Sequence, residues 1–122
     1  MEVNYITQLN GAFSRFRGDG RITAVHSSLY LAFFELWNSQ RFPEFFAVSG
    51  SEVMRLAKIR SKTTYHKRMV ELNAYGYLDY RPSHDPARGS KIRMSIFVPE
   101  LTKKWTWVNQ KMNNHLSKNW PL

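Results

Sequence analysis

Residues 51–80, SEVMRLAKIRSKTTYHKRMVELNAYGYLDY, decide the fold of this 122-residue chain. The stretch opens on a short helix, because Val53, Leu56 and Ala57 recur at the spacing that places apolar side chains on one helix face. Just before it, residues 49–52 read Ser-Gly-Ser-Glu, which matches a capping box at a helix start. This helix is only about two turns long, so a tight turn must follow it.

A longer helix and two strands follow the turn. Ser61 predicts the N-cap of a helix over residues 62–75, and Gly76 stands where glycine commonly ends a helix. Residues 77–81 and 91–98 predict two strands, and the loop between them is full of turn-forming residues. The sequence therefore predicts a β-hairpin with an extended tip.

The order helix, turn, helix and hairpin over residues 49–98 resembles a winged helix-turn-helix. The quoted stretch is similar to that of bacterial transcription regulators and of replication-initiation proteins from phages, plasmids and transposons. In that family a short turn precedes the recognition helix, and a Leu-x-x-x-Gly-apolar-apolar sequence follows it. The resemblance implies an α+β fold with a three-helix core and a β-hairpin wing, extended here by helices at both ends.

The resemblance also assigns individual positions. Ile59 matches the apolar position of the turn, and Tyr77-Leu78 matches the start of the wing strand. The core positions of the recognition helix are matched by Tyr65, Met69, Leu72 and Tyr75. Tyr65 stands where the family usually has a smaller aliphatic residue and Tyr75 where it has leucine, so the resemblance implies a core rebuilt around aromatic rings.

The opposite side of the second helix carries its polar residues. With Tyr65 and Met69 toward the core, the side chains that face solvent are Lys62, Thr63, His66, Lys67 and Val70. The first four lie near the helix start, the end that a recognition helix places in the major groove of DNA. Lysines at this end oppose the helix dipole, so a bound phosphate would relieve an electrostatic misfit. The alternative for the same residues is an ordinary solvated helix face.

The hairpin adds further cations. Lys91 and Arg93 share one strand face, and Arg88 lies at a flexible tip that suits a minor groove or a phosphate backbone. A plain surface hairpin is the alternative, and Arg55 and Lys58 are further candidates for phosphate contact. The residues that we expect at the DNA are Arg60, Ser61, Lys62, Thr63, Thr64, His66, Lys67, Arg81, Arg88, Ser90, Lys91 and Arg93.

Two helices are expected before this region. Residues 4–17 predict the first, with an apolar stripe of Ile6, Leu9, Phe13 and Phe16. Thr23 is the expected N-cap of the second, which runs to about residue 40 and is apolar on more than one side. We expect the first helix, the C-terminal segment or a second subunit to cover this surplus apolar surface.

The remaining segments complete a single domain. Residues 45–48 predict a short strand, and about 100–116 predict a final amphipathic helix. The 122 residues fit one compact domain, with its core at about residues 21–98.

Charge points to a polyanionic partner. The net charge is +9, and residues 55–93 hold ten Lys and Arg against three Asp and Glu. Such a concentration favours a local nucleic-acid-binding face over a general solubility charge, although charge alone suits anionic lipid equally well. No signal peptide or membrane span is evident, and cysteine is absent, so we expect a soluble, cytoplasmic protein.

Nothing in the sequence indicates an enzyme. The nine acidic residues are scattered singly, without a close pair suited to acid-base or two-metal chemistry. The histidines, His26, His66, His84 and His115, fall on separate predicted elements without metal-ligand spacing. The glycines form no phosphate-binding loop, so we expect no metal and no cofactor.

The sequence therefore predicts a non-catalytic protein that binds double-stranded DNA, as a transcription regulator, an excisionase-like factor or a replication factor of a mobile element. The alternative is a winged-helix module that docks on another protein of a replication or recombination complex, since the same fold serves both roles. A homodimer is expected to read a repeated DNA site, because one helix-turn-helix reads only a few base pairs.

Overall fold

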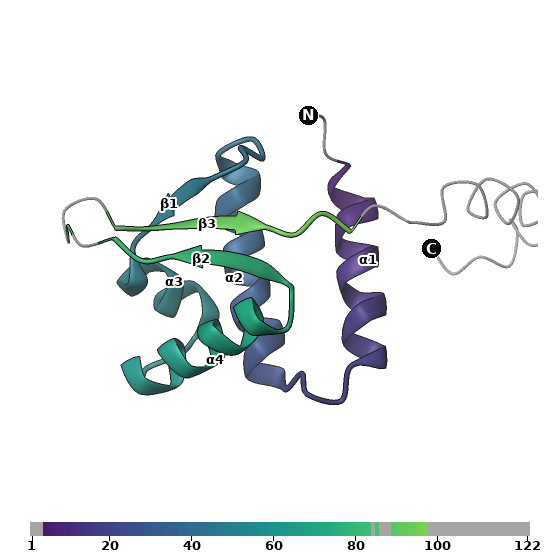
Figure 1. Cartoon of the computed structure of the whole chain (residues 1–122), viewed down its shortest axis with the longest axis horizontal. Coiled ribbons are helices and arrows are strands. Elements are labelled where there is room, and N and C mark those ends of the chain that lie inside the picture. Colours follow the sequence, from purple (N-terminus) through teal and green to yellow (C-terminus); the bar gives the residue numbers. More distant parts are fainter. Residues whose placement is uncertain (1–3, 84, 86–88, 98–122) are drawn as a thin grey trace, which may run out of the picture.

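The computed structural model describes residues 4–83, 85 and 89–97, which fold as an α+β domain (Figure 1). Among these residues the elements in chain order are α1 (Tyr5–Gly18), α2 (Ala24–Ser39), β1 (Phe46–Val48), α3 (Gly50–Ala57), α4 (Lys62–Ala74), β2 (Leu78–Arg81) and β3 (Ser90–Met94). The expected helix at about 100–116 lies outside the described residues, as do His84 and Arg88. The order of elements agrees with the predicted one, and it is compatible with a winged-helix arrangement.

The three strands form one antiparallel sheet in the order β1-β3-β2. In its register Phe46 pairs with Ile92 and Tyr80 also pairs with Ile92, so β3 is the central strand. Side chains alternate between the two faces. The inner face is buried and consists of Phe46, Val48, Leu78, Ile92 and Met94. The outer face, which includes Lys91 and Arg93, is exposed, as the alternation along β3 predicted.

Helix α2 is the centre of the core. Leu29, Tyr30, Phe33 and Trp37 are at most 1% exposed, so the helix is buried on more than one side, as its composition predicted. Each such side chain stabilises the fold by about 1.5–3 kcal/mol through loss of apolar surface from water. Helix α1 covers one side of α2, with the rings of Phe16 and Tyr30 5.3 Å apart. The covering role that the sequence left open thus falls in part to α1.

The predicted apolar stripe of α1 is correct for Leu9 and Phe16, which pack against the core, and wrong for Ile6 and Phe13, which are 56% and 37% exposed. The fully buried residues of α1 are instead Gln8 and Ala12. The reason is a close approach of the chain after β3: a Cβ on Gly11 would lie 2.7 Å from Phe97 Cβ. Small residues permit this approach, and larger apolar ones would prevent it.

Gln8 supplies the polar part of the same contact. Its Nε2 donates to the Tyr30 hydroxyl at 3.1 Å and to the Ser95 carbonyl at 2.8 Å, and its Oε1 accepts from the Phe97 amide at 3.0 Å. A buried amide is tolerated only when such partners satisfy it. One glutamine therefore joins α1, α2 and the segment after β3.

The helix caps agree with the sequence at three of four positions. Thr23 and Ser61 accept from the backbone amides of the helices that they begin, and Gly76 follows α4 with a φ of +90°. The capping box predicted at residues 49–52 is wrong. Ser49 is the N-cap of α3, but its hydroxyl bonds to the Ser51 hydroxyl at 2.9 Å and makes no cap bond to the backbone.

We expect the Gly11→Ala substitution to lower the free energy of unfolding by about 1–3 kcal/mol, because the new methyl group meets the Phe97 backbone at 2.8 Å and cannot be relieved by a side-chain rotation. Urea denaturation measures the change. Gly18→Ala is the matched control, since a Cβ there meets nothing within 4 Å and alanine is the better helix former. Equal stability of the two variants would contradict the close packing of α1.

Candidate nucleic-acid interface

Helix α4 has the two faces that its sequence predicted. Tyr65, Met69 and Leu72 are buried. The side chains of Lys62, Thr63, His66, Lys67 and Val70 are exposed. Thr64, another predicted contact residue, is half-buried on the helix. The helical periodicity therefore predicted the exposed surface of α4 correctly.

The start of α4 is electropositive for two reasons. Its first turn contains no acidic residue and begins with Lys62, and the exposed backbone amides at a helix N-terminus add partial positive charge. Ser61 Oγ satisfies only one of these amides, by accepting from Thr64 N at 3.2 Å. Positive side chains at this end are unfavourable by themselves, and an anion bound there would offset the cost.

Lysines and arginines differ in their ion pairing in the described part of the chain. Every ion pair there that joins a carboxylate to Lys or Arg uses arginine, whereas the four described lysines are unpaired: Lys58, Lys62, Lys67 and Lys91. Three of them lie in the turn before α4 and in its first two turns. Arg60 lies in the same turn and is also exposed and unpaired within the described residues. The uncompensated charge is thus concentrated where α4 begins.

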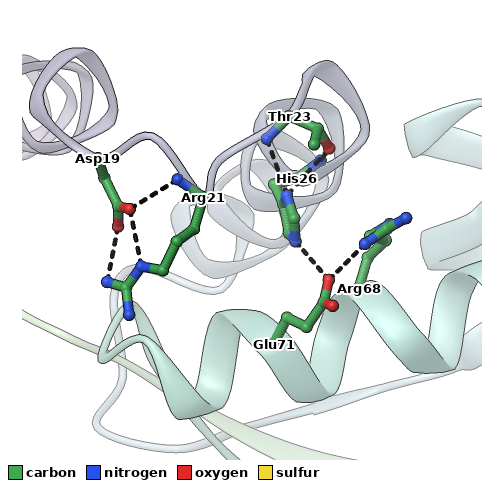
Figure 2. A network of polar contacts seen from close by, with 6 residues as sticks. All are labelled: Asp19, Arg21, Thr23, His26, Arg68 and Glu71. Carbon is green, nitrogen blue, oxygen red and sulfur yellow. Dashed lines mark hydrogen bonds and ion pairs between the residues drawn. The ribbon is translucent and has the colours of Figure 1, made fainter.

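A buried histidine holds α4 against α2. His26 is 1% exposed, and its Nδ1 accepts from the Thr23 backbone amide at 2.9 Å. Because Nδ1 accepts, the ring proton lies on Nε2, which donates to Glu71 Oε1 at 2.8 Å (Figure 2). Arg68 Nη1 donates to the same carboxylate oxygen at 2.6 Å. The exposed side of α4 is therefore oriented by contacts on its opposite flank.

This role of His26 was not predicted from the sequence, although a signal was present. His26 lies three residues after the cap Thr23, the position from which a side chain reaches back to the cap amide in a capping box. Glutamate is the usual residue there, and histidine performs the same contact. Its second ring nitrogen is then free to bond another helix.

A second polar cluster lies at the other end of α4. Asp19 accepts from Arg21 through both guanidinium and backbone donors and from the Tyr77 hydroxyl, and these bonds hold its pKa well below the usual range. Arg21 also stacks over the Tyr75 ring at 4.0 Å. Tyr75, expected in the core, packs against it but is only half-buried, and Arg21 covers one face of its ring.

The predicted wing cations divide into two kinds. Arg81 and Arg93 both bond to Asp79, and both stack over the Phe45 ring, at 4.7 and 5.3 Å. Arg93 also pairs with Glu44 at 3.5 Å. Lys91, on the same sheet face, has no such partner. Ser90 is half-buried and its hydroxyl lies 3.3 Å from that of Tyr80. Arg88 lies outside the described residues.

Two hollows meet at the start of α4. One, of about 460 Å³, lies between α4 and the loop end of the β2–β3 hairpin, and Ser83, Ser90 and Tyr80 line it. The other, of about 520 Å³, lies between α3 and α4. Tyr65 and His66 line both, so the surface is concave on either side of these two residues. The start of α4 thus lies close to the end of β2 and the start of β3.

The described residues were also searched for a metal site and for a membrane-spanning helix. Within that part of the chain, no three His, Asp or Glu side chains are grouped as metal ligands would be. None of its helices is long and apolar enough to cross a membrane.

We expect the free energy of unfolding to fall less on acidification in the Glu71→Gln variant than in the wild type. Arg68 and then His26 bond the charged form of the Glu71 carboxyl, which lowers its pKa in the folded protein. Such a group stabilises the fold above its unfolded pKa of about 4.3, and this contribution is lost as the pH falls toward the lower folded pKa. The unfolding free energy, measured by urea denaturation from about pH 6 to pH 3, should fall less steeply in the variant.

The control for this measurement is Glu52→Gln, because Glu52 is exposed and reaches only Arg55, at 4.0 Å. This variant should keep the wild-type slope of unfolding free energy against pH. A wild-type slope in Glu71→Gln would contradict the network.

Comparison with protein-family models, with curated proteins and with solved structures finds no match for this chain. The resemblance of residues 49–98 to winged helix-turn-helix proteins therefore stays a prediction.

Proposed function

We propose that the protein binds double-stranded DNA without catalysis, as a winged helix-turn-helix in which α3 and α4 form the helix-turn-helix and the β2–β3 hairpin forms the wing. The observation that carries the proposal is the unpaired cationic surface at the start of α4. Four described acids, Asp19, Glu44, Glu71 and Asp79, pair with arginines, and the lysines at the start of α4 remain available to phosphates.

The arrangement of α4 and the hairpin supports the proposal. An α-helix fits the major groove of B-DNA, and a helix-turn-helix inserts the N-terminal part of its second helix. The first two turns of α4 offer Lys62, Thr63, His66 and Lys67 to base edges and phosphates. Figure 1 shows the end of β2 and the start of β3 at the same end of the molecule as the start of α4, an arrangement in which both could reach one duplex. Arg60, Ser61 and Lys91 would contact the flanking backbone.

The paired arginines of the sheet have a lesser role in this proposal. Arg81 and Arg93 would have to leave Asp79 and the Phe45 ring to reach a phosphate, so we assign them a smaller share of the affinity than Lys91. The biological process, as a transcription regulator or as an accessory or replication factor of a mobile element, is supported by the family resemblance alone.

We expect the double substitution Lys62→Ala, Lys67→Ala to weaken duplex binding about 10- to 100-fold at low salt. It should also reduce the slope of log K against log salt by about 2, because two phosphate contacts no longer release counterions. Fluorescence anisotropy on a labelled duplex at several salt concentrations measures both quantities. Arg17→Ala with Arg41→Ala is the charge-matched control, since both arginines are exposed and lie on other segments. The proposal is wrong if affinity and slope change equally in the two double variants.

The homodimer that a repeated DNA site would require is favoured by one observation. Helix α1 leaves Tyr5 50%, Ile6 56% and Phe13 37% exposed, which is unusual for large apolar side chains on one helix. A second copy of the chain would cover them in the dimer that a repeated DNA site requires.

We expect Ile6→Ser with Phe13→Ser to shift the chain toward monomer in sedimentation velocity, because the substitutions remove apolar surface from the contact. Short-duplex binding by α4 should be retained. A wild-type chain that stays monomeric at every concentration, with and without duplex, would exclude self-association through α1.

A further inference from the structure

The hollow between α3 and α4 combines an apolar floor with a cationic rim. Met54, Ile59 and Tyr65 form the floor, Arg55 and Lys62 supply the charges of the rim, and His66 lies beside them. Met54 and Ile59 are half-buried, so each keeps part of its side chain open to solvent. We call this hollow of about 520 Å³ the α3–α4 groove.

Part of this floor also belongs to the core. Tyr65 is 5% exposed, and Met54 and Ile59 pack against the core with part of each side chain. The rest of Met54 lines the groove that Lys62 and Arg55 border, so an open apolar surface lies beside two cations. The groove therefore fits a ligand that is anionic overall and apolar at one point.

Duplex DNA has this combination at thymine. In the major groove the edges of the base pairs present hydrogen-bond donors and acceptors, and the C5-methyl group of thymine is the one apolar group among them. The backbone beside it carries the negative charge that the rim cations would meet. Arg55 and Lys62 come from different helices, so they can contact phosphates on either side of a base that enters the groove.

We propose that the α3–α4 groove binds the methyl-bearing edge of a thymine, with Met54 as the side chain that packs on the methyl group. The unbranched thioether of methionine adapts its shape and packs well on small apolar groups. The inference rests on the proposed DNA-binding function and deepens it, because it makes a thymine part of the preferred site. Lys62 and Lys67 supply affinity in this scheme, and Met54 supplies selectivity.

The test uses the full chain and a duplex selected from a random pool. Each thymine of the selected site is replaced in turn by deoxyuridine, which pairs identically and lacks only the methyl group. We expect one or two positions at which the replacement weakens binding about fourfold, the effect of exposing roughly one buried methyl group. At those positions Met54→Gln, which keeps the length of the side chain, should bind the thymine and uracil duplexes equally.

Val70→Ala distinguishes the groove from the outer ridge of α4. Val70 is 54% exposed and is the other apolar side chain that α4 offers to a base. The fourfold preference for thymine should persist in Val70→Ala. Loss of the preference in Val70→Ala, with its retention in Met54→Gln, would overturn the assignment to the groove. Circular dichroism melts of both variants ensure that folded proteins are compared.

The outcomes separate this inference from the function on which it rests. If the chain retains no duplex from the pool, the proposed function fails and the thymine assignment fails with it. If duplexes bind tightly but deoxyuridine has no effect at any position, DNA binding stands and only the thymine assignment is overturned. Abolished self-association in Met54→Gln, with an unchanged preference for thymine, would assign the groove to a protein contact instead.

Discussion

The orientation of α4 depends on the hydrogen bonds of one buried imidazole. His26 is 1% exposed, so each ring nitrogen needs a hydrogen-bond partner. A buried donor left without a partner costs about 1–3 kcal/mol of stability. Thr23 satisfies Nδ1 and thereby fixes the proton on Nε2, which can then bond only an acceptor. Glu71 is that acceptor, and it lies on the flank of α4 opposite the hollows. The cap of one helix thus determines how another helix presents its outer face.

The distribution of ion pairs explains why a positive surface persists on α4. Surface ion pairs contribute little to stability, about 0–1 kcal/mol each, so their main effect here is on the field around the molecule. Asp79 and Glu44 neutralise arginines on the outer face of the sheet, and Glu71 neutralises Arg68 on the inner flank of α4. No carboxylate of the described residues lies within ion-pair distance of Lys62 or Lys67. Repulsion between these lysines lowers stability, and a polyanion would remove it.

Sequence reasoning succeeded where the determining contacts are local. Ser61 begins α4 through a hydrogen bond to a nearby amide, and Gly76 follows its end with a positive φ. The buried and exposed faces of that helix follow from its period alone. It failed where contacts with a distant segment determine which side chains are buried or paired. The close approach of Phe97 to α1, more than eighty residues away, requires the small residue Gly11 and could not be predicted from the helical period. The availability of Arg93 depends likewise on Glu44, which precedes the strand β1 that pairs with β3 only in the folded sheet. The exposed surface of α4 was therefore predictable, and the pairing of the wing cations was not.

Residues whose type or backbone conformation is unusual for their position lie around the turn before α4. Lys58 has a φ of +62°, a left-handed conformation that costs a residue with a Cβ about 1 kcal/mol and that glycine adopts freely. Lys58 is the C-cap of α3, where a cation is favourable for that helix, and its charge lies in the turn that leads to the positive start of α4. Met54 leaves apolar surface open to solvent beside it. The backbone conformation of Lys58 and the open surface of Met54 are each unfavourable for folding, and a bound apolar group would relieve the second. Because local conflicts that a sequence retains tend to mark functional sites, this turn and the groove beside it are the physical basis for the proposed DNA site.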